Sequence, residues 1–209
     1  MDAVAAQPGK VTVLALAALT NIALAVRLDP NFAANLGSLV VLGGAYNVMG
    51  NVDPVAEANI WHDPEAADFA LGSFPDGVVK LIGLDVTQLC MMPGSQLDAL
   101  KVSGGRFAEY VWSISQFYKA YHMTSNRLDG IFLHDPTAFV AVFRPELFSW
   151  TPASVCVALE GCARARTILD LGTKKCAPTR RLPRARLTRS DAAGTTSTRG
   201  RGGRSAWLR

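Results

Sequence analysis

Long hydrophobic runs, paired cysteines and charged residues are all scarce in this sequence. The longest apolar stretch, residues 11–26, is shorter than the roughly 20 residues that span a bilayer, and Thr20 and Asn21 interrupt it. No basic segment of the secretory type precedes that stretch. We therefore expect a cytoplasmic protein that does not associate with membranes.

The four cysteines form no CxxC pair and have no metal-ligand spacing with the three histidines. Such spacing marks zinc and redox sites, so neither kind of site is predicted. Cys156 and Cys162 flank a predicted hairpin, but that placement alone does not argue for a disulfide. In a cytoplasmic protein the cysteines are expected to be reduced thiols.

Positive charge is concentrated near the C-terminal end. Residues 176–209 contain nine arginines and one acid, Asp191, which gives this segment a net charge of +8. Because the whole chain carries +4, the preceding residues carry −4. The charge of the body therefore gives no argument for nucleic acid as a partner. Nucleic-acid binding through the arginine-rich segment is a minor alternative that only the clustered arginines support.

The rest of the chain has the composition of a folded domain. Of all residues 49% are hydrophobic and 18% are charged, a balance that suits a buried core. After residue 175 the hydrophobic periodicity ends, and arginine, proline, glycine, serine and threonine dominate. Such a segment buries too little apolar area to offset the entropy of ordering. We predict one domain over residues 1–175 and a disordered tail over residues 176–209.

Short β-favouring runs alternate with helical patterns along the predicted domain. The expected strands are residues 11–16, 38–42, 78–84, 131–133, 155–159 and 167–169. The expected helices are residues 21–27, a helix that begins at 64, and residues 106–122 and 137–147. We expect Thr20 to cap the first helix and Asp63 the second. This alternation predicts an α/β fold with a mainly parallel sheet and flanking helices.

Several short motifs resemble those of the inosine–uridine-preferring nucleoside hydrolase family. In chain order they are LTNIA at 19–23, GGA at 43–45, GN at 50–51, AEAN at 56–59, DPEAA at 63–67, GLDVT at 83–87 and HDP at 134–136. Each motif is weak by itself, but their shared order makes the resemblance specific. It covers roughly residues 10–175, and the AEAN form is similar to plant-type uridine/inosine nucleosidases.

The resemblance implies a hydrolase that cleaves uridine- or inosine-type ribonucleosides to base and ribose, with calcium as the cofactor. His134 matches the position that protonates the departing base, and the ordinary pKa of histidine suits that role. Tyr118, Tyr121 and His122 lie near the end of a predicted helix. They either reach the base pocket or pack in the core, and both interpretations stay open. The family also implies association into homo-oligomers.

The resemblance further assigns residues to the sugar and to the cation. Asn51, Glu57 and Asn59 match residues that hold the ribose hydroxyls. Asp135 and the backbone carbonyl of Leu16 match calcium ligands. Without the resemblance, simpler interpretations apply, because an aspartate before proline is commonly a helix cap and loop asparagines commonly form Asx-turns.

One feature of the family is missing. Its aspartate-rich DxDPGxDD motif supplies most calcium ligands and the base that activates water, and the sequence contains no such motif. One carboxylate and one carbonyl are a poor site for a cation that takes roughly six to eight oxygens. We therefore expect an N-terminally truncated form of the family fold that is inactive or weakly active by itself. The alternative is a non-catalytic truncated isoform, or a gene-model fragment, that associates with full-length subunits.

Overall fold

The computed structural model describes residues 1–172 of the chain and the backbone of residues 181–187. Most of its strands form one sheet in the order β1-β2-β3-β8-β6-β7. The bounds of these strands are Thr12–Ala15 for β1, Ser38–Leu42 for β2, Val79–Ile82 for β3, Arg181–Leu187 for β8, Phe148–Val157 for β6 and Thr167–Asp170 for β7. A second, two-stranded sheet pairs β4 (Met91–Pro93) with β5 (Gly130–Phe132).

The first strands of the main sheet are parallel. β1 pairs with β2, β2 pairs with β3, and β3 meets β8, all in the parallel sense. β6 runs antiparallel to β8 and to β7, so β6 and β7 form the hairpin that the sequence predicted. The α/β class with a mainly parallel sheet is therefore confirmed.

Both faces of strand β2 are covered by helices. Leu39 and Val41 belong to a core cluster that includes residues of α5 (Pro64–Leu71), against which residues of α2 (Thr20–Leu28) pack. Val40 and Leu42 belong to the cluster on the other face, beneath α9 (His134–Phe143). Since side chains alternate between the faces of a strand, a strand covered on both sides reads as a continuous apolar run. This is why residues 38–42 were recognisable in the sequence.

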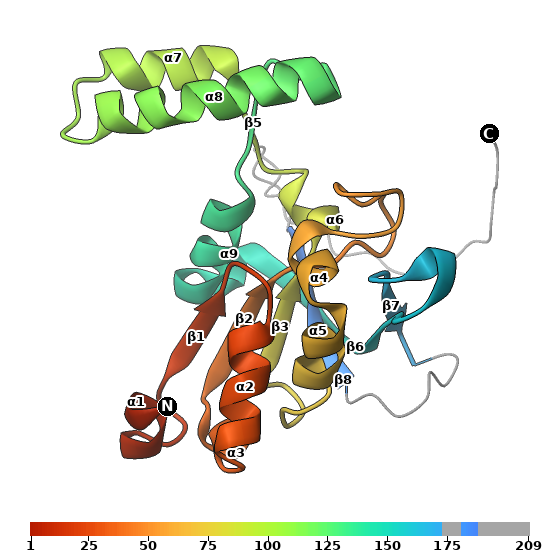
Figure 1. Cartoon of the computed structure of the whole chain (residues 1–209). Helices are drawn as coiled ribbons and strands as arrows, with labels where there is room; N and C mark the ends of the chain where they lie inside the picture. Colours follow the sequence, from red (N-terminus) through yellow and green to blue (C-terminus); the bar gives the residue numbers. More distant parts are fainter. Residues whose placement is uncertain (173–180, 188–209) are drawn as a thin grey trace, which may run out of the picture.

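Helices α7 and α8 form a hairpin that stands away from the main sheet and joins it through β4 and β5 (Figure 1). The bounds of the remaining helices are Gly94–Val102 for α7, Ala108–Asn126 for α8, Asp2–Ala6 for α1, Phe32–Asn35 for α3, Ala58–His62 for α4 and Leu84–Thr87 for α6, with the 3-10 turns Pro145–Leu147 and Gly161–Ala163. Within the described part of the chain, no helix is long and apolar enough to cross a membrane.

The two predicted helix caps have different outcomes. Asp63 is the N-cap of α5 and accepts a hydrogen bond from the backbone N–H of Ala66 at 3.0 Å, as predicted. The prediction for Thr20 is wrong, because α2 begins at Thr20 itself and Leu19 is its N-cap. The Thr20 hydroxyl instead donates to Asp63 at 2.5 Å, which connects the beginnings of α2 and α5.

The predicted tail, residues 176–209, lies largely outside the described residues. Within it, residues 181–187 form β8, which pairs along β6 from Phe148 to Ser154. The prediction of a disordered tail rested on the missing hydrophobic periodicity. Strand pairing uses backbone N–H and C=O groups, so it does not require that periodicity.

The turn after β2 packs closely against the β6–β7 hairpin. Gly44 has a φ of +88°, and a Cβ placed on it would lie 2.7 Å from the hydroxyl oxygen of Thr167. Thr167 is itself buried. Any side chain at residue 44 would therefore be strained by its backbone conformation and would also clash.

Replacing Gly44 by alanine should lower the free energy of unfolding by about 3 kcal/mol, because backbone strain and steric overlap add. Gly77 provides a matched control, since its φ is +84° but no atom lies within 4 Å of its Cβ position. Gly77→Ala should cost only about 1 kcal/mol. Urea unfolding of both variants checks this prediction, and equal costs would contradict the packing argument.

Candidate active site

The predicted residues Leu16, Asn51, Glu57 and Asn59 lie in the segments that follow β1 and β2, whereas His134 and Asp135 begin α9, after β5 of the second sheet. Leu16 follows β1, the turn at Gly43 and Gly44 follows β2, and α6 follows β3. The Gly44 carbonyl accepts a hydrogen bond from the N–H of Leu84 at 2.8 Å, which joins the loops after β2 and β3. The carboxyl ends of parallel strands meet at one edge of a sheet, which is where open α/β folds bind ligands.

Glu57 holds the loop after β2 in place. Its side chain is 5% exposed and caps α4. One carboxylate oxygen accepts from the N–H of Gly44 at 3.0 Å and of Ile60 at 3.1 Å, and the other accepts from the N–H of Asn59 at 3.0 Å. Burial raises the pKa of the Glu57 carboxyl, while these N–H groups act in the opposite direction. Three of its roughly four acceptor positions are therefore used by the backbone.

Asn59 connects the ends of two strands. Its side-chain amide donates to the carbonyl of Leu42 at 3.0 Å and to the carbonyl of Leu16 at 3.3 Å. Asn51, by contrast, is exposed, and its side-chain oxygen accepts from the N–H of Ala58 at 2.9 Å. The structure thus brings Leu16 and Asn59 into contact next to Glu57, and Asn51 stabilises the segment that carries Glu57 and Asn59.

His134 is the first residue of α9, and one ring nitrogen is already engaged. Its Nδ1 lies 2.6 Å from the hydroxyl oxygen of Thr87, the last residue of α6. Burial, followed by the electrostatic effect of His122, lowers the pKa of His134 to about 4. The imidazole is therefore neutral at pH 7. Thr87 belongs to the GLDVT motif, but no sequence signal showed that it contacts His134.

His134 and Asp135 border a cavity of about 360 Å³. Helix α8 contributes Ile114 and Tyr118 to the lining, and Phe132 also lines the cavity. Burial raises the pKa of the Asp135 carboxyl. Asp135 does not cap α9, because that helix has no side-chain cap bond. The simpler interpretation of this aspartate as a helix cap is therefore not supported.

The three aromatic residues near the end of α8 differ in position. Tyr118 lines the cavity, and burial, then Asp135 and Tyr121, raise its pKa. His122 is buried with its ring 4.3 Å from that of Tyr118 and 5.1 Å from that of Phe132, measured between centroids. Tyr121 is about half exposed. Tyr118 therefore fits the pocket interpretation, whereas His122 fits the packing interpretation.

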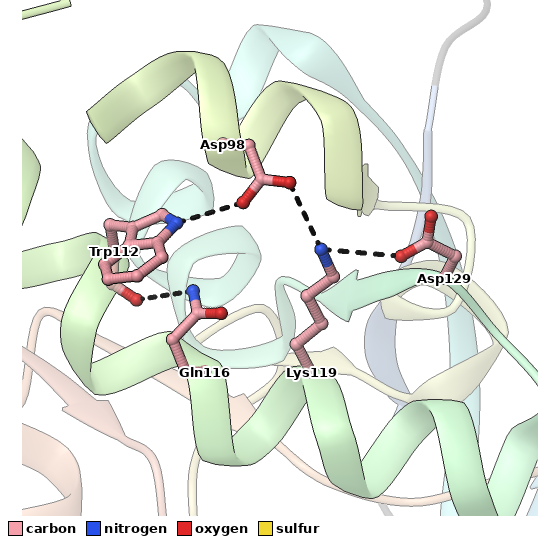
Figure 2. A network of polar contacts seen from close by, with 5 residues as sticks. All are labelled: Asp98, Trp112, Gln116, Lys119 and Asp129. Atoms are coloured by element: carbon pink, nitrogen blue, oxygen red, sulfur yellow. Dashed lines mark hydrogen bonds and ion pairs between the residues drawn. The ribbon is translucent and has the colours of Figure 1, made fainter. Parts of the chain in front are cut away.

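A polar network holds the helical hairpin in the position that forms the cavity wall (Figure 2). Trp112 donates from its indole N–H to Asp98 at 3.0 Å, which joins α8 to α7. Lys119 lies 3.4 Å from Asp98 and 3.6 Å from Asp129, the residue just before β5. Since Tyr118 neighbours Lys119 on α8, these contacts also fix where Tyr118 lies. Both carboxylates of the network are solvent-exposed, so these contacts orient the hairpin more than they stabilise the fold.

The oxygen ligands present do not fit a calcium ion by themselves. Among residues 1–172, no group of three or more histidine, cysteine, aspartate or glutamate side chains is placed to hold a metal. The predicted ligands are one carboxylate, Asp135, and one carbonyl, that of Leu16. That carbonyl already accepts a hydrogen bond from Asn59. Calcium takes roughly six to eight oxygens, so this set is too small.

Comparison with known proteins decides the family. The family model described as inosine-uridine preferring nucleoside hydrolase matches residues 1–193. The chain belongs to the inosine–uridine-preferring nucleoside hydrolase family. A probable uridine nucleosidase 1 from Oryza sativa subsp. japonica is 43% identical over 168 residues, which are 80% of this chain and 51% of that protein. Uridine nucleosidase 1 from Arabidopsis thaliana is 40% identical, over 80% of this chain and 49% of its own length.

Solved structures of nucleoside hydrolases share the fold. A plant nucleoside hydrolase superposes with a TM-score of 0.83 at 35% identity, over 88% of this chain and 59% of that one. A purine-preferring ribonucleoside hydrolase from Gardnerella vaginalis superposes with a TM-score of 0.78 at 32% identity, over 88% and 58% of the two chains. The chain spans about half the length of the curated relatives it matches. The sequence relatives and the solved structures therefore both support the family and the fold of this chain.

Glu57→Gln should lower the free energy of unfolding by about 2 kcal/mol, because one side-chain oxygen becomes an N–H₂ group that opposes backbone N–H donors. Glu65→Gln is a suitable control. Glu65 is exposed and pairs with Arg164 at 2.7 Å, so its loss should change the free energy of unfolding far less than the loss of Glu57. Thermal or urea unfolding measures both, and a neutral Glu57→Gln would contradict the role of this carboxylate in holding the loop.

Lowering the pH from 6.5 to 4 should destabilise the fold through His134. In this window the unfolded chain binds a proton at His134 that the folded chain does not. At 1.36 kcal/mol per pH unit, the free energy of unfolding should fall by up to about 3 kcal/mol. His134→Gln should remove this component, so its stability should depend less on pH than that of the wild type. If the free energy of unfolding of the wild type and of His134→Gln changed equally with pH, the folded state would not disfavour a charged His134.

Proposed function

We propose that this chain provides the leaving-group and sugar-binding part of a nucleoside hydrolase that cleaves uridine- and inosine-type ribonucleosides to base and ribose. The observation that carries the proposal is that His134, whose lowered pKa keeps it neutral, lines the same cavity as Tyr118. The names of the curated relatives support uridine as a substrate. The family supports cleavage of the N-ribosyl bond.

Cleavage of an N-ribosyl bond passes through a state in which positive charge develops on the ribose and negative charge on the base. A neutral imidazole that carries a proton on the ring nitrogen toward the cavity can transfer it to the departing base. Asn59 would contact the sugar through its side-chain oxygen, since its amide N–H₂ group donates to the carbonyls of Leu16 and Leu42. Glu57 retains about one acceptor position that a ribose hydroxyl can use.

We further propose that calcium-dependent turnover requires carboxylates in addition to Asp135. The described residues provide an acid for the leaving group but too few oxygens for a calcium ion. Hydrolysis by this chain alone is therefore expected to be weak or absent. The aspartate-rich motif of the family is the natural source of the additional ligands.

The test is release of uracil from uridine and of hypoxanthine from inosine, with calcium or with a chelator. The chain is assayed alone and after co-expression with a segment of a plant relative that carries the aspartate-rich motif. We expect calcium-dependent hydrolysis in the second case, and His134→Ala should lower its rate by about 100-fold or more.

His62→Ala is the matched histidine control, because His62 is exposed and outside the cavity lining. It should retain the activity of the parent. If the co-expressed, folded complex hydrolyses neither nucleoside, or if His134→Ala has the same rate as the parent, the proposed function is wrong.

A further inference from the structure

The hydroxyl group of Thr87 is buried against a single polar neighbour. Thr87 is 0% exposed, and among the described residues its hydroxyl has one hydrogen-bond partner, Nδ1 of His134 at 2.6 Å. A hydroxyl can donate one hydrogen and accept others, whereas a neutral imidazole carries its hydrogen on only one nitrogen. The direction of this hydrogen bond therefore decides which nitrogen of His134 is protonated.

The two possible directions differ in what they leave unpaired. If Nδ1–H donated to the threonine oxygen, the hydroxyl hydrogen of Thr87 would be buried without an acceptor. If the hydroxyl donates to an unprotonated Nδ1, only lone pairs of the oxygen remain unused. A buried donor without a partner is the costlier defect. The second direction is therefore favoured, and it places the hydrogen of the ring on Nε2.

The surrounding backbone keeps the two groups within hydrogen-bond distance. The N–H of Leu133, just before His134, donates to the carbonyl of Cys90 at 2.8 Å. Cys90 in turn donates from its N–H to the carbonyl of Thr87 at 3.1 Å. The β4–β5 pairing continues this connection through Met91. The start of α9 and the end of α6 are therefore joined independently of the side-chain contact.

We propose that Thr87 is a positioning residue that donates its hydroxyl hydrogen to Nδ1 of His134 and thereby fixes the tautomer with a proton on Nε2. His134 borders the cavity and its Nδ1 is occupied, so Nε2 is the nitrogen left for a bound base. The catalytic meaning of this arrangement rests on the proposed function. The hydrogen-bond arrangement itself does not, and it can be tested without any turnover.

The test is nitrogen-15 NMR of the full chain, labelled at histidine, at a pH where the ring is neutral. The pattern of couplings from the ring carbon-bound hydrogens distinguishes a protonated from an unprotonated nitrogen, and His134→Gln assigns the signals. In the wild type we expect Nε2 to be protonated and Nδ1 to be unprotonated and hydrogen-bonded. Thr87→Ser, which keeps the hydroxyl, should preserve this pattern.

Thr87→Val has nearly the same shape but no hydroxyl, so the Nδ1 signal should shift and the second tautomer should become populated. Thr137→Val is the matched control. Thr137 is also buried, and its hydroxyl donates to the carbonyl of Leu133, the N-cap of α9, so the variant should leave the His134 signals in the wild-type pattern.

A wild-type spectrum with the proton on Nδ1 would overturn the proposal, even if Thr87→Val does not fold. A folded Thr87→Val variant with unchanged signals would overturn it as well. Neither result depends on hydrolysis, so a failed activity assay with the expected tautomer would count against the proposed function alone.

Discussion

The structure of the site depends on the backbone of one residue, Gly44. Its N–H is bound by the buried carboxylate of Glu57, and its carbonyl accepts from Leu84 at the start of α6. Its φ of +88° and the contact with Thr167 leave no room for a side chain. The loop after β2, the helix after β3 and the β6–β7 hairpin therefore all meet at residue 44, a position where only glycine fits.

This constraint connects the two parts of the candidate site. On one side, Glu57 also fixes the first turn of α4, which carries Asn59 to the carbonyl ends of β1 and β2. On the other side, α6 ends in Thr87, which contacts His134. A carboxylate that accepts three backbone N–H groups is costly to move, because each donor would lose a charge-assisted hydrogen bond in a buried setting. Glu57 thus has a structural task whether or not it also contacts a sugar.

The parts of the fold that could be predicted are those where hydrophobic periodicity or helix-capping residues give a strong local signal. The run at 38–42 and the cap at Asp63 were found because burial on both faces and an acid before proline leave clear local signals. Thr20 was misassigned because its hydroxyl bonds to Asp63, 43 residues away in sequence, and local patterns carry no information on such a partner. The contact of Thr87 with His134, 47 residues apart, was missed for the same reason. The strand at 181–187 has no hydrophobic pattern, since its pairing with β6 uses the backbone.

The groups that the proposed reaction needs are present on the leaving-group side of the candidate site but mostly missing on its cation side. Under the proposed function, the leaving-group side has the groups it needs, because a neutral histidine, a tyrosine that lines the same cavity and apolar walls would protonate and enclose a base. The proposed cation side has one carboxylate, that of Asp135, whose pKa is raised by burial. Added carboxylates without a cation would raise that pKa further through repulsion, whereas carboxylates together with calcium would lower it. If Asp135 is a calcium ligand, as the proposed function has it, its electrostatics favour the joint arrival of ligands and cation, and metal binding would then be coupled to completion of the site.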